Sequence, residues 1–309
     1  MRVVIALGGN ALASGNEGSE AQRARIADAA SAIADIARTH EVVITHGNGP
    51  QIGQRAVQLS EGGTSQTLDV LGAETEGMLG YWIESELAGI LPTSELATLI
   101  TQVEVSADDA ALQQPTKPIG PLVSAERADA LRESFGYSMA RFEGGFRRVV
   151  GSPKPLIIRE ARAIRLLLDA GVLVICAGGG GIPVARSEDG GLVGVEAVID
   201  KDRTAALLAV SVEADRLLLL TNVAGVYFDW PARQQLIRRS DPATLSRSRF
   251  EAGTMGPKVE AACAFAARTG KVACIGALSD ARRVFAGDSG TWISNDAQFT
   301  PERAEPAAA

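Results

Sequence analysis

The chain has 309 residues, of which 46% are apolar, 22% are charged and 5% are aromatic, and its formal net charge is −7. A chain of this length can bury a large core without disulfides or structural metals. The acidic balance argues against partners such as nucleic acid or an anionic membrane surface, because both require a basic face. Any anionic ligand must therefore be held by a local site.

The cysteine and histidine content limits metal and redox chemistry. Cys176, Cys263 and Cys274 form no C-x-x-C pair, so we expect reduced thiols in a cytoplasmic protein. His40 and His46 are the only histidines, which argues against a multi-histidine metal centre. No apolar run approaches the roughly 18 to 20 residues of a membrane span. We therefore expect no side-chain metal site and no membrane partner.

Short apolar runs alternate with amphipathic stretches along most of the chain. The continuous Val, Ile and Leu character of several runs predicts strands buried on both faces, as in a parallel sheet. The expected strands are 2–7, 41–46, 96–105, 172–177, 215–221, 271–276 and 290–293. The expected helices are 19–39, 67–88, 161–170, 203–212 and 257–270. This alternation predicts an α/β sandwich with right-handed crossovers.

Two segments depart from this alternation. Residues 112–151 are rich in proline, glycine and charge, with one expected helix near 124–134. A long insertion in a compact domain is usually functional and often a lid, although a solvated excursion is the alternative. Residues 295–309 are polar and alanine-rich, which predicts a disordered tail. We therefore expect one catalytic domain over 1–294, with a small protruding subdomain at 112–151.

Three of the expected strands run directly into glycine-rich turns. The turns are Gly8-Gly9-Asn10, Gly47-Asn48-Gly49 and Gly178-Gly179-Gly180-Gly181. The carboxyl ends of parallel strands lie along one edge of the sheet, where ligands bind. Glycine lets successive backbone N–H groups converge on an anion. A tight βα turn needs glycine in any case, but three such turns on one edge favour an anion site.

The common nucleotide-binding fingerprints do not occur. There is no G-x-x-x-x-G-K-[ST] run, and the segment 47–53 has its last glycine one residue too late for G-x-G-x-x-G. A dinucleotide-dependent oxidoreductase remains the alternative from another functional class. Quenching of nicotinamide fluorescence on titration would support it.

Only five of the basic residues are lysines, and their positions are informative. Lys258 falls in the first turn of an expected helix, where it opposes the helix dipole unless an anion lies nearby. Asp200 is expected to cap the helix that Lys201 opens, and Asp202 could hold the lysines in place or reach a metal through water. Lys117 stands between prolines that limit backbone freedom. These lysines are therefore candidates for binding an anionic ligand.

Several motifs together resemble a known family. They are IALGGNAL, THGNGPQIG, LDVLGAETEGMLGY, TQVEV, PTKPIGP, RRVVGSPKP, CAGGGGIPV, GVEAVIDKD and GTMGPKVEAA. In combination they closely resemble the carbamate kinases, of the amino-acid kinase fold, over about residues 1–293. PTKPIGP and AVIDKD separate carbamate kinases from acetylglutamate, aspartate and uridylate kinases. Those enzymes also usually carry a lysine in the first glycine turn, which this chain lacks.

The resemblance implies a fold, a reaction and an assembly. The implied fold is an eight-stranded, three-layer αβα sandwich around a mainly parallel open sheet, with a lid subdomain. The implied reaction is reversible phosphoryl transfer between ATP and carbamate, with Mg²⁺ as cofactor, giving ADP and carbamoyl phosphate. The implied assembly is a homodimer.

The resemblance also assigns roles to residues. Lys201 and Lys258 would neutralise the transferring phosphoryl group, Asp202 would orient them, and Lys117 would reach in from the lid. The backbone amides that would hold carbamate and phosphoryl oxygens are those of Gly8, Gly9, Asn10, Gly47, Asn48 and Gly49. The residues that would border the nucleotide are Gly179, Gly180, Thr221, Met255 and Lys258.

Three positions depart from the family pattern. Gly151 stands where proline is usual, which would loosen the lid hinge; Arg159 replaces an apolar residue, and Asn222 replaces a common aspartate. Two further alternatives are another acyl-phosphate kinase of this fold acting on an amino acid such as acetylglutamate, and a non-catalytic nucleotide-binding regulator. The presence of Lys201, Asp202 and Lys258 argues against the regulator.

Overall fold

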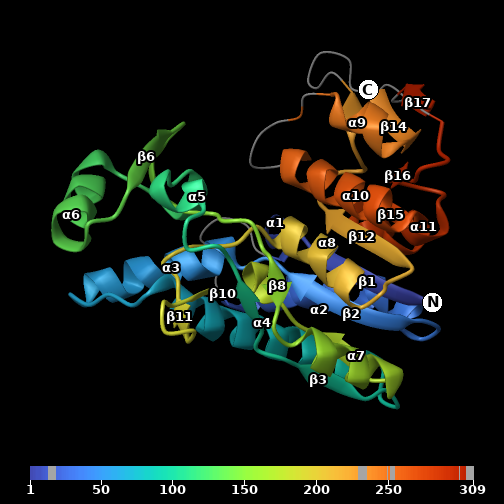
Figure 1. The fold of residues 1–309 in the computed structure, drawn as a ribbon, viewed down its shortest axis with the longest axis horizontal. Coiled ribbons are helices and arrows are strands. Elements are labelled where there is room, and N and C mark those ends of the chain that lie inside the picture. The colour runs from blue at the N-terminus through green and yellow to red at the C-terminus, as the bar shows by residue number, and fades with distance from the viewer. Residues whose placement is uncertain (13–18, 229–234, 249, 251–254, 299, 304–309) are drawn as a thin grey trace.

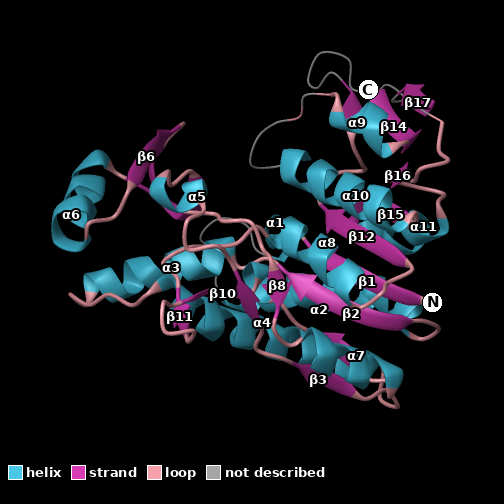
Figure 2. Cartoon of the chain, in the orientation of Figure 1, coloured by secondary structure: helices cyan, strands magenta, loops and turns pink. Residues whose placement is uncertain are grey.

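The centre of the molecule is a ten-stranded, mainly parallel sheet with helices on both faces (Figures 1 and 2). The structure is a computed structural model that describes all residues except 13–18, 229–234, 249, 251–254, 299 and 304–309. Across the sheet the strands are β13 (Tyr227–Phe228), β14 (Gln235–Ser240), β16 (Thr291–Ile293), β15 (Val272–Ala277), β12 (Arg216–Thr221), β1 (Arg2–Leu7), β2 (Glu41–His46), β9 (Leu173–Ile175) and β3 (Leu96–Thr98), and β17 (Thr300–Arg303) pairs with β14.

The parallel pairs form the middle of this sheet, which confirms the predicted α/β sandwich. β1 pairs in parallel with β2 and β12, β12 with β15, and β9 with β2 and β3. The antiparallel pairs are β13 with β14, β14 with β17, and β15 with β16. The expectation of eight strands is therefore wrong for this chain, because strands after residue 226 extend the sheet at one side.

The two faces of the sheet explain the apolar character of its strands. Val3, Ile5 and Leu7 of β1 face one apolar core, which α2 (Ser19–Ala37), α4 (Leu68–Ile90) and α11 (Ala281–Ala286) cover. Val4 and Ala6 face a second core, which α7 (Ala161–Asp169), α8 (Lys201–Ser211) and α10 (Met255–Thr269) cover. Because both faces are buried, β1 has no polar alternation. Each fully buried Leu or Ile contributes roughly 1.5–3 kcal/mol.

Most expected elements are confirmed within a few residues, but the expected strand 96–105 is wrong. It divides into β3 and β4 (Gln102–Glu104), which belong to different sheets. β4 pairs with β8 (Ile157–Ile158) and β10 (Ile182–Arg186), and β11 (Leu192–Gly194) completes this four-stranded sheet. Periodicity alone cannot show this division, because both halves of the run are apolar enough to form strands.

The segment 112–151 forms a substructure that stands apart from the main sheet, and we call it the lid (Figure 1). It contains β5 (Lys117–Val123), α6 (Ala125–Phe135), β6 (Met139–Phe142) and β7 (Gly145–Val150), and α5 (Ala110–Gln113) overlaps its start. The expected helix is α6, which Ser124 caps at its start and Gly136, with φ of 67°, ends. The antiparallel sheet of β5, β7 and β6 was not predicted.

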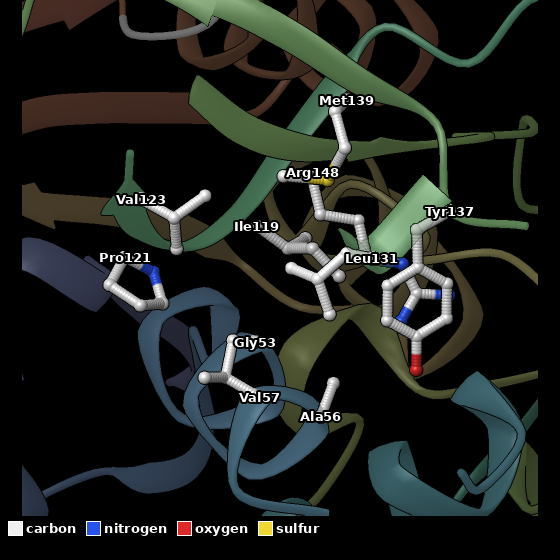
Figure 3. Close-up of a pocket in the computed structure, with 10 residues that line it drawn as sticks. All are labelled: Gly53, Ala56, Val57, Ile119, Pro121, Val123, Leu131, Tyr137, Met139 and Arg148. Carbon is white, nitrogen blue, oxygen red and sulfur yellow. The ribbon is translucent and has the colours of Figure 1, made fainter. Parts of the chain in front are cut away.

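The base of the lid rests on α3 (Gly49–Glu61). The α3 backbone at Gly53 lies so close to β5 that a Cβ there would be 2.1 Å from the Gly120 backbone. Beside this contact, Ile119, Leu131 and Met139 line a small apolar hollow (Figure 3). The Arg148 guanidinium stacks 3.5 Å from the centre of the Tyr137 ring at the same place. The lid is thus held to the body by close backbone contact and by packing.

Part of the expected disordered tail is structured. Residues 300–303 form β17, whose backbone pairs antiparallel with β14, so the prediction for 295–309 is wrong at these four residues. Backbone pairing with an existing strand overrides the polar composition on which the prediction rested. Residues 299 and 304–309 lie outside the described part of the chain.

The Gly53 contact gives a stability prediction. Gly53→Ala should lower the free energy of unfolding by about 1–3 kcal/mol, because its Cβ must displace the Gly120 backbone. The matched control is Gly72→Ala in α4, where an added Cβ has no neighbour within 4 Å, and alanine should stabilise the helix by about 0.5–1 kcal/mol. Urea unfolding measures both, and equal effects at the two positions would contradict the packing described.

Candidate active site

The three glycine turns meet at the carboxyl ends of β1, β2 and β9, as the sequence predicts. A Cβ on Gly47 would lie 2.8 Å from the Gly9 nitrogen and 3.1 Å from Cδ of Lys201. A Cβ on Gly179 would lie 2.2 Å from the Asn48 carboxamide. Since real side chains do not fit at such distances, these glycines are needed for the close approach of the turns. Backbone N–H groups and one lysine therefore share a small region.

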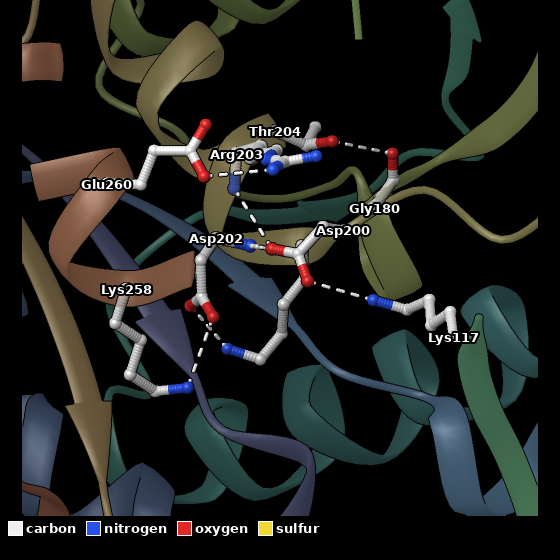
Figure 4. A network of polar contacts seen from close by, with 9 residues as sticks. Lys117, Gly180, Asp200, Asp202, Arg203, Thr204, Lys258 and Glu260 are labelled. Carbon is white, nitrogen blue, oxygen red and sulfur yellow. Dashed lines mark hydrogen bonds and ion pairs between the residues drawn. The ribbon is translucent and has the colours of Figure 1, made fainter. Parts of the chain in front are cut away.

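The start of α8 brings three lysines and two aspartates together (Figure 4). Lys201 Nζ donates to Asp202 Oδ1 at 2.7 Å, and Lys258 Nζ donates to Asp202 Oδ2 at 3.1 Å. Lys117 Nζ, from the lid, donates to Asp200 Oδ2 at 2.8 Å. Asp200 also caps α8 by accepting from the backbone N–H groups of residues 202 and 203, as expected. The chain thus brings residues more than 130 positions apart into one network.

Two lysines of this network meet at one carboxylate and are largely buried. Lys201 and Lys258 are 13% and 12% exposed, and they share one carboxylate, Asp202, that is 5% exposed. The two largely buried ammonium groups therefore lie together beside the glycine turns. An anion bound there would make charge-assisted hydrogen bonds with both.

Burial and neighbouring charge shift the pKa values of two members. Burial lowers the pKa of Lys258, and the positive charge of Lys201 lowers it further. Burial favours the neutral form of Asp200, yet the Lys117 ammonium holds the pKa of this carboxyl well below its ordinary value. Asp200 therefore stays charged and keeps Lys117 directed from the lid to α8.

His46 packs behind the second turn instead of offering a charged group. Its ring is fully buried against Gly178, and burial lowers its pKa to about 4. Among the described residues, its Nε2 has no hydrogen-bond partner. The ring is therefore neutral near pH 7 and contributes no charge to the site.

The residues expected around a nucleotide lie in two separate places. Thr221 ends β12, and Met255 begins α10 one turn before Lys258. Gly179 and Gly180 follow β9, which β1 and β2 separate from β12 in the sheet. Both glycines are buried, and the Gly180 carbonyl accepts from Thr204 Oγ1 at 2.9 Å. Of these five residues, Thr221, Met255 and Lys258 therefore belong to β12 and α10, whereas Gly179 and Gly180 lie beyond β1 and β2.

The described residues contain no group of three or more His, Cys, Asp or Glu side chains that could hold a metal ion. Both aspartates at the start of α8 are occupied by lysines. Within the same part of the chain, no helix is long and apolar enough to cross a membrane.

The structure shows the contacts of the three residues that depart from the family pattern. A Cβ on Gly151 would lie 3.0 Å from the Ala111 carbonyl oxygen, and the Gly151 carbonyl accepts from Val198 N, so this hinge position is packed and hydrogen-bonded. Arg159 donates at 2.6 Å to the buried carboxylate of Glu104. The Asn222 side chain accepts from Thr221 Oγ1 at 3.3 Å.

The sequence reasoning missed Thr75, whose hydroxyl accepts from Asn48 Nδ2 at 2.9 Å, and Glu76, which contacts the third turn. The signal that could have revealed them is helical register. Thr75 lies one turn from Leu71 and Leu79, so the helix buries polar side chains on an apolar stripe.

Comparison with known proteins identifies the family to which this fold belongs. Residues 1–276 match the amino acid kinase family. A UMP kinase from Bacillus anthracis shares the fold, with a TM-score of 0.55 at 17% identity and coverage of 97% of this chain and 98% of that chain. The chain belongs to the amino acid kinase family.

More similar proteins narrow the assignment. A carbamate kinase from Rhizobium meliloti is 49% identical over 304 residues, covering 96% of this chain and 94% of that protein. One from Haemophilus influenzae is 47% identical, covering 95% and 97%. The structure of carbamate kinase from Giardia lamblia bound to AMP-PNP superimposes with a TM-score of 0.85 at 36% identity, covering 95% and 98%. Within the family, the chain is one of the carbamate kinases.

Proposed function

We propose that this protein catalyses reversible phosphoryl transfer between ATP and carbamate, giving ADP and carbamoyl phosphate. The observation that carries the proposal is the shared carboxylate of Asp202, which holds Lys201 and Lys258 beside the converged glycine turns. This arrangement places two ammonium groups next to backbone donors. Phosphoryl transfer needs such positioning and charge neutralisation more than it needs covalent chemistry.

The reaction requires no strong general base at this site. A carbamate oxygen attacks the γ-phosphorus, a new P–O bond forms, and the bond to the β–γ bridging oxygen breaks to release ADP. The nucleophile is already an anion, which agrees with a site whose nearest histidine is buried and neutral. Charge on the three equatorial oxygens is offset by Lys201, Lys258 and backbone N–H groups.

The two sides of the network suggest two subsites. We place carbamate and the transferring phosphoryl group against the turns at 8–10 and 47–49, and the nucleotide against Thr221 and Met255. Gly179 is buried against Asn48 and Gly180 against Ile199, so we assign both glycines to shaping the carbamate side and not to bordering the nucleotide. Lys117 would close the site from the lid.

Magnesium enters this proposal as part of the nucleotide substrate. The described residues offer no cluster of three ligands for a resident ion, and both aspartates near the site pair with lysines. The ion would be bound by nucleotide phosphates and would add to the neutralisation of their charge.

The direct test is ATP formation from ADP and carbamoyl phosphate by the purified protein, with and without Mg²⁺. We expect ATP only when both substrates and Mg²⁺ are present. Acetylglutamate and glutamate, offered with ATP, test the alternative of an amino-acid kinase. ATP consumption with acetylglutamate, and none with carbamate, would overturn the proposal in favour of that alternative.

Lys258→Ala should lower kcat by about 10²- to 10³-fold, because one donor to the transferring group is lost. Lys271→Ala is the matched control, since Lys271 pairs with Asp215 outside the network. Both variants should keep the native circular dichroism spectrum. Near-wild-type turnover of folded Lys258→Ala would refute the role of this lysine.

Lys117→Ala should raise KM for carbamoyl phosphate more than KM for ADP, because Lys117 approaches α8 from the lid. Lys154→Ala is the control, as this exposed lysine also lies between prolines. Initial rates with each substrate varied in turn give both constants. A larger rise in KM for ADP than in KM for carbamoyl phosphate would contradict the assignment of Lys117 to the carbamate side.

We further propose a homodimer formed through α4 and β3. Among the described residues, β3 is an edge strand of the main sheet. Tyr81 on α4 is 61% exposed and Ile100, just after β3, is 47% exposed. A Cβ on Gly77, one turn from Tyr81, would lie 3.4 Å from Ile100 Cδ1, so the two side chains border one patch. Gly80, in contrast, serves internal packing against Thr98.

Sedimentation equilibrium tests the assembly. We expect twice the chain mass for the wild type and a shift toward the monomer for Ile100→Asp, because a charge at an apolar interface is costly. A monomeric wild type would contradict the homodimer. An Ile100→Asp variant that stays fully dimeric would contradict the proposed interface.

The compartment we propose is the cytoplasm. Cys176, Cys263 and Cys274 are free and buried. Free thiols are typical of a reducing compartment.

A further inference from the structure

Two consecutive residues of α4 hold two different glycine turns. Thr75 Oγ1 accepts from Asn48 Nδ2 at 2.9 Å and donates to the Leu71 carbonyl at 2.7 Å. The Glu76 carboxylate accepts from Gly178 N at 2.8 Å and from Thr101 N at 3.3 Å. Neighbouring residues of a helix point about 100° apart, so one turn of α4 can reach both loops.

Both side chains occupy positions where an apolar residue would be less costly for the fold. Thr75 and Glu76 are almost completely buried, within a helix whose neighbouring residues Leu71 and Leu79 lie in apolar cores. Burial raises the pKa of Glu76 to about 8. A buried carboxyl that accepts from two backbone N–H groups fixes the loops that carry them, at a cost in desolvation.

The surroundings leave the turns little freedom. The Asn48 carboxamide lies between the Thr75 hydroxyl and the backbone of Gly179, where a Cβ would be 2.2 Å away. Gly178 is equally confined, because a Cβ there would lie 2.4 Å from the His46 ring and 3.0 Å from Glu76 Cγ. The position of the second turn therefore depends on the third turn and on α4.

We propose that Thr75 and Glu76 are positioning residues: Thr75 orients the 47–49 turn through Asn48, and Glu76 fixes the 178–181 turn behind it. This inference rests on the proposed function, since the 47–49 turn is the one assigned to carbamate and the phosphoryl group. The nucleotide side begins at β12, which β1 separates from β2, the strand that leads into the 47–49 turn. Loss of Thr75 therefore weakens binding of one substrate selectively.

The kinetic test compares Thr75→Val, which keeps the shape but removes the acceptor, with Thr75→Ser, which keeps the hydroxyl. We expect Thr75→Val to raise KM for carbamoyl phosphate about tenfold, as the loss of a buried hydrogen bond predicts, while KM for ADP changes less than twofold. Thr75→Ser should stay within about threefold of the wild type for both. The matched control is Thr269→Val, since Thr269 makes the same bond to a helix carbonyl at the far end of α10.

Three kinetic results would overturn the inference. These are an equal rise in both KM values, no rise in either, or no rescue by Thr75→Ser, since a purely structural threonine would behave in one of these ways. Glu76→Gln, which keeps an acceptor for Gly178 but turns an amide toward Thr101, provides a second variant if Thr75→Val does not fold. We expect it to raise KM for carbamoyl phosphate at least threefold with KM for ADP unchanged, and an equal rise in both would contradict the role of Glu76.

Hydrogen exchange separates this inference from the proposed function. Amides in a peptide spanning 45–50 should exchange at least tenfold faster in Thr75→Val than in the wild type. Their exchange rate should be unchanged in Thr269→Val. If the wild type forms no ATP, the proposed function fails, and exchange still decides the positioning role. If the wild type is active and exchange at 45–50 does not change, the positioning role fails alone.

Discussion

The site depends on one carboxylate that two ammonium groups share. Without Asp202, Lys201 and Lys258 would place two like charges in a largely desolvated region. With it, the two ammonium groups lie together. In the proposed reaction both offset the charge of the phosphoryl group, and this role explains why lysines occupy helix starts where the dipole disfavours them.

The fold supplies the second requirement, which is the convergence of backbone donors. The order β12-β1-β2-β9 places successive strand ends side by side, so the turns at 8–10, 47–49 and 178–181 meet without long loops. Glycine is needed at Gly47 and Gly179 because neighbouring backbone and side-chain atoms occupy the space of a Cβ. The lid completes the arrangement by directing Lys117 to Asp200 on α8.

Much of this could be predicted from the sequence, because it follows from local patterns. The apolar run 2–7 and the glycine-rich turn after it are visible in the sequence. Lysines at the starts of expected helices are also recognisable, because the helix dipole disfavours them there. The division of 96–105 into two strands, the lid sheet and β17 depend on pairing partners far along the chain, which periodicity does not encode. The pairing of Thr75 with Asn48 was missed for the same reason. The separation of Gly179 and Gly180 from Thr221 and Met255 depends on the strand order, which places β1 and β2 between β12 and β9.

A double-substitution cycle on kcat/KM for carbamoyl phosphate tests the shared cation site most directly. Lys201→Ala, Lys258→Ala and the double variant are compared with the wild type, and each is checked for native folding. If the two lysines act as one unit through Asp202, the loss in the double variant stays well below the product of the two single losses. Losses that multiply fully would show that the lysines act independently, and would contradict the shared site.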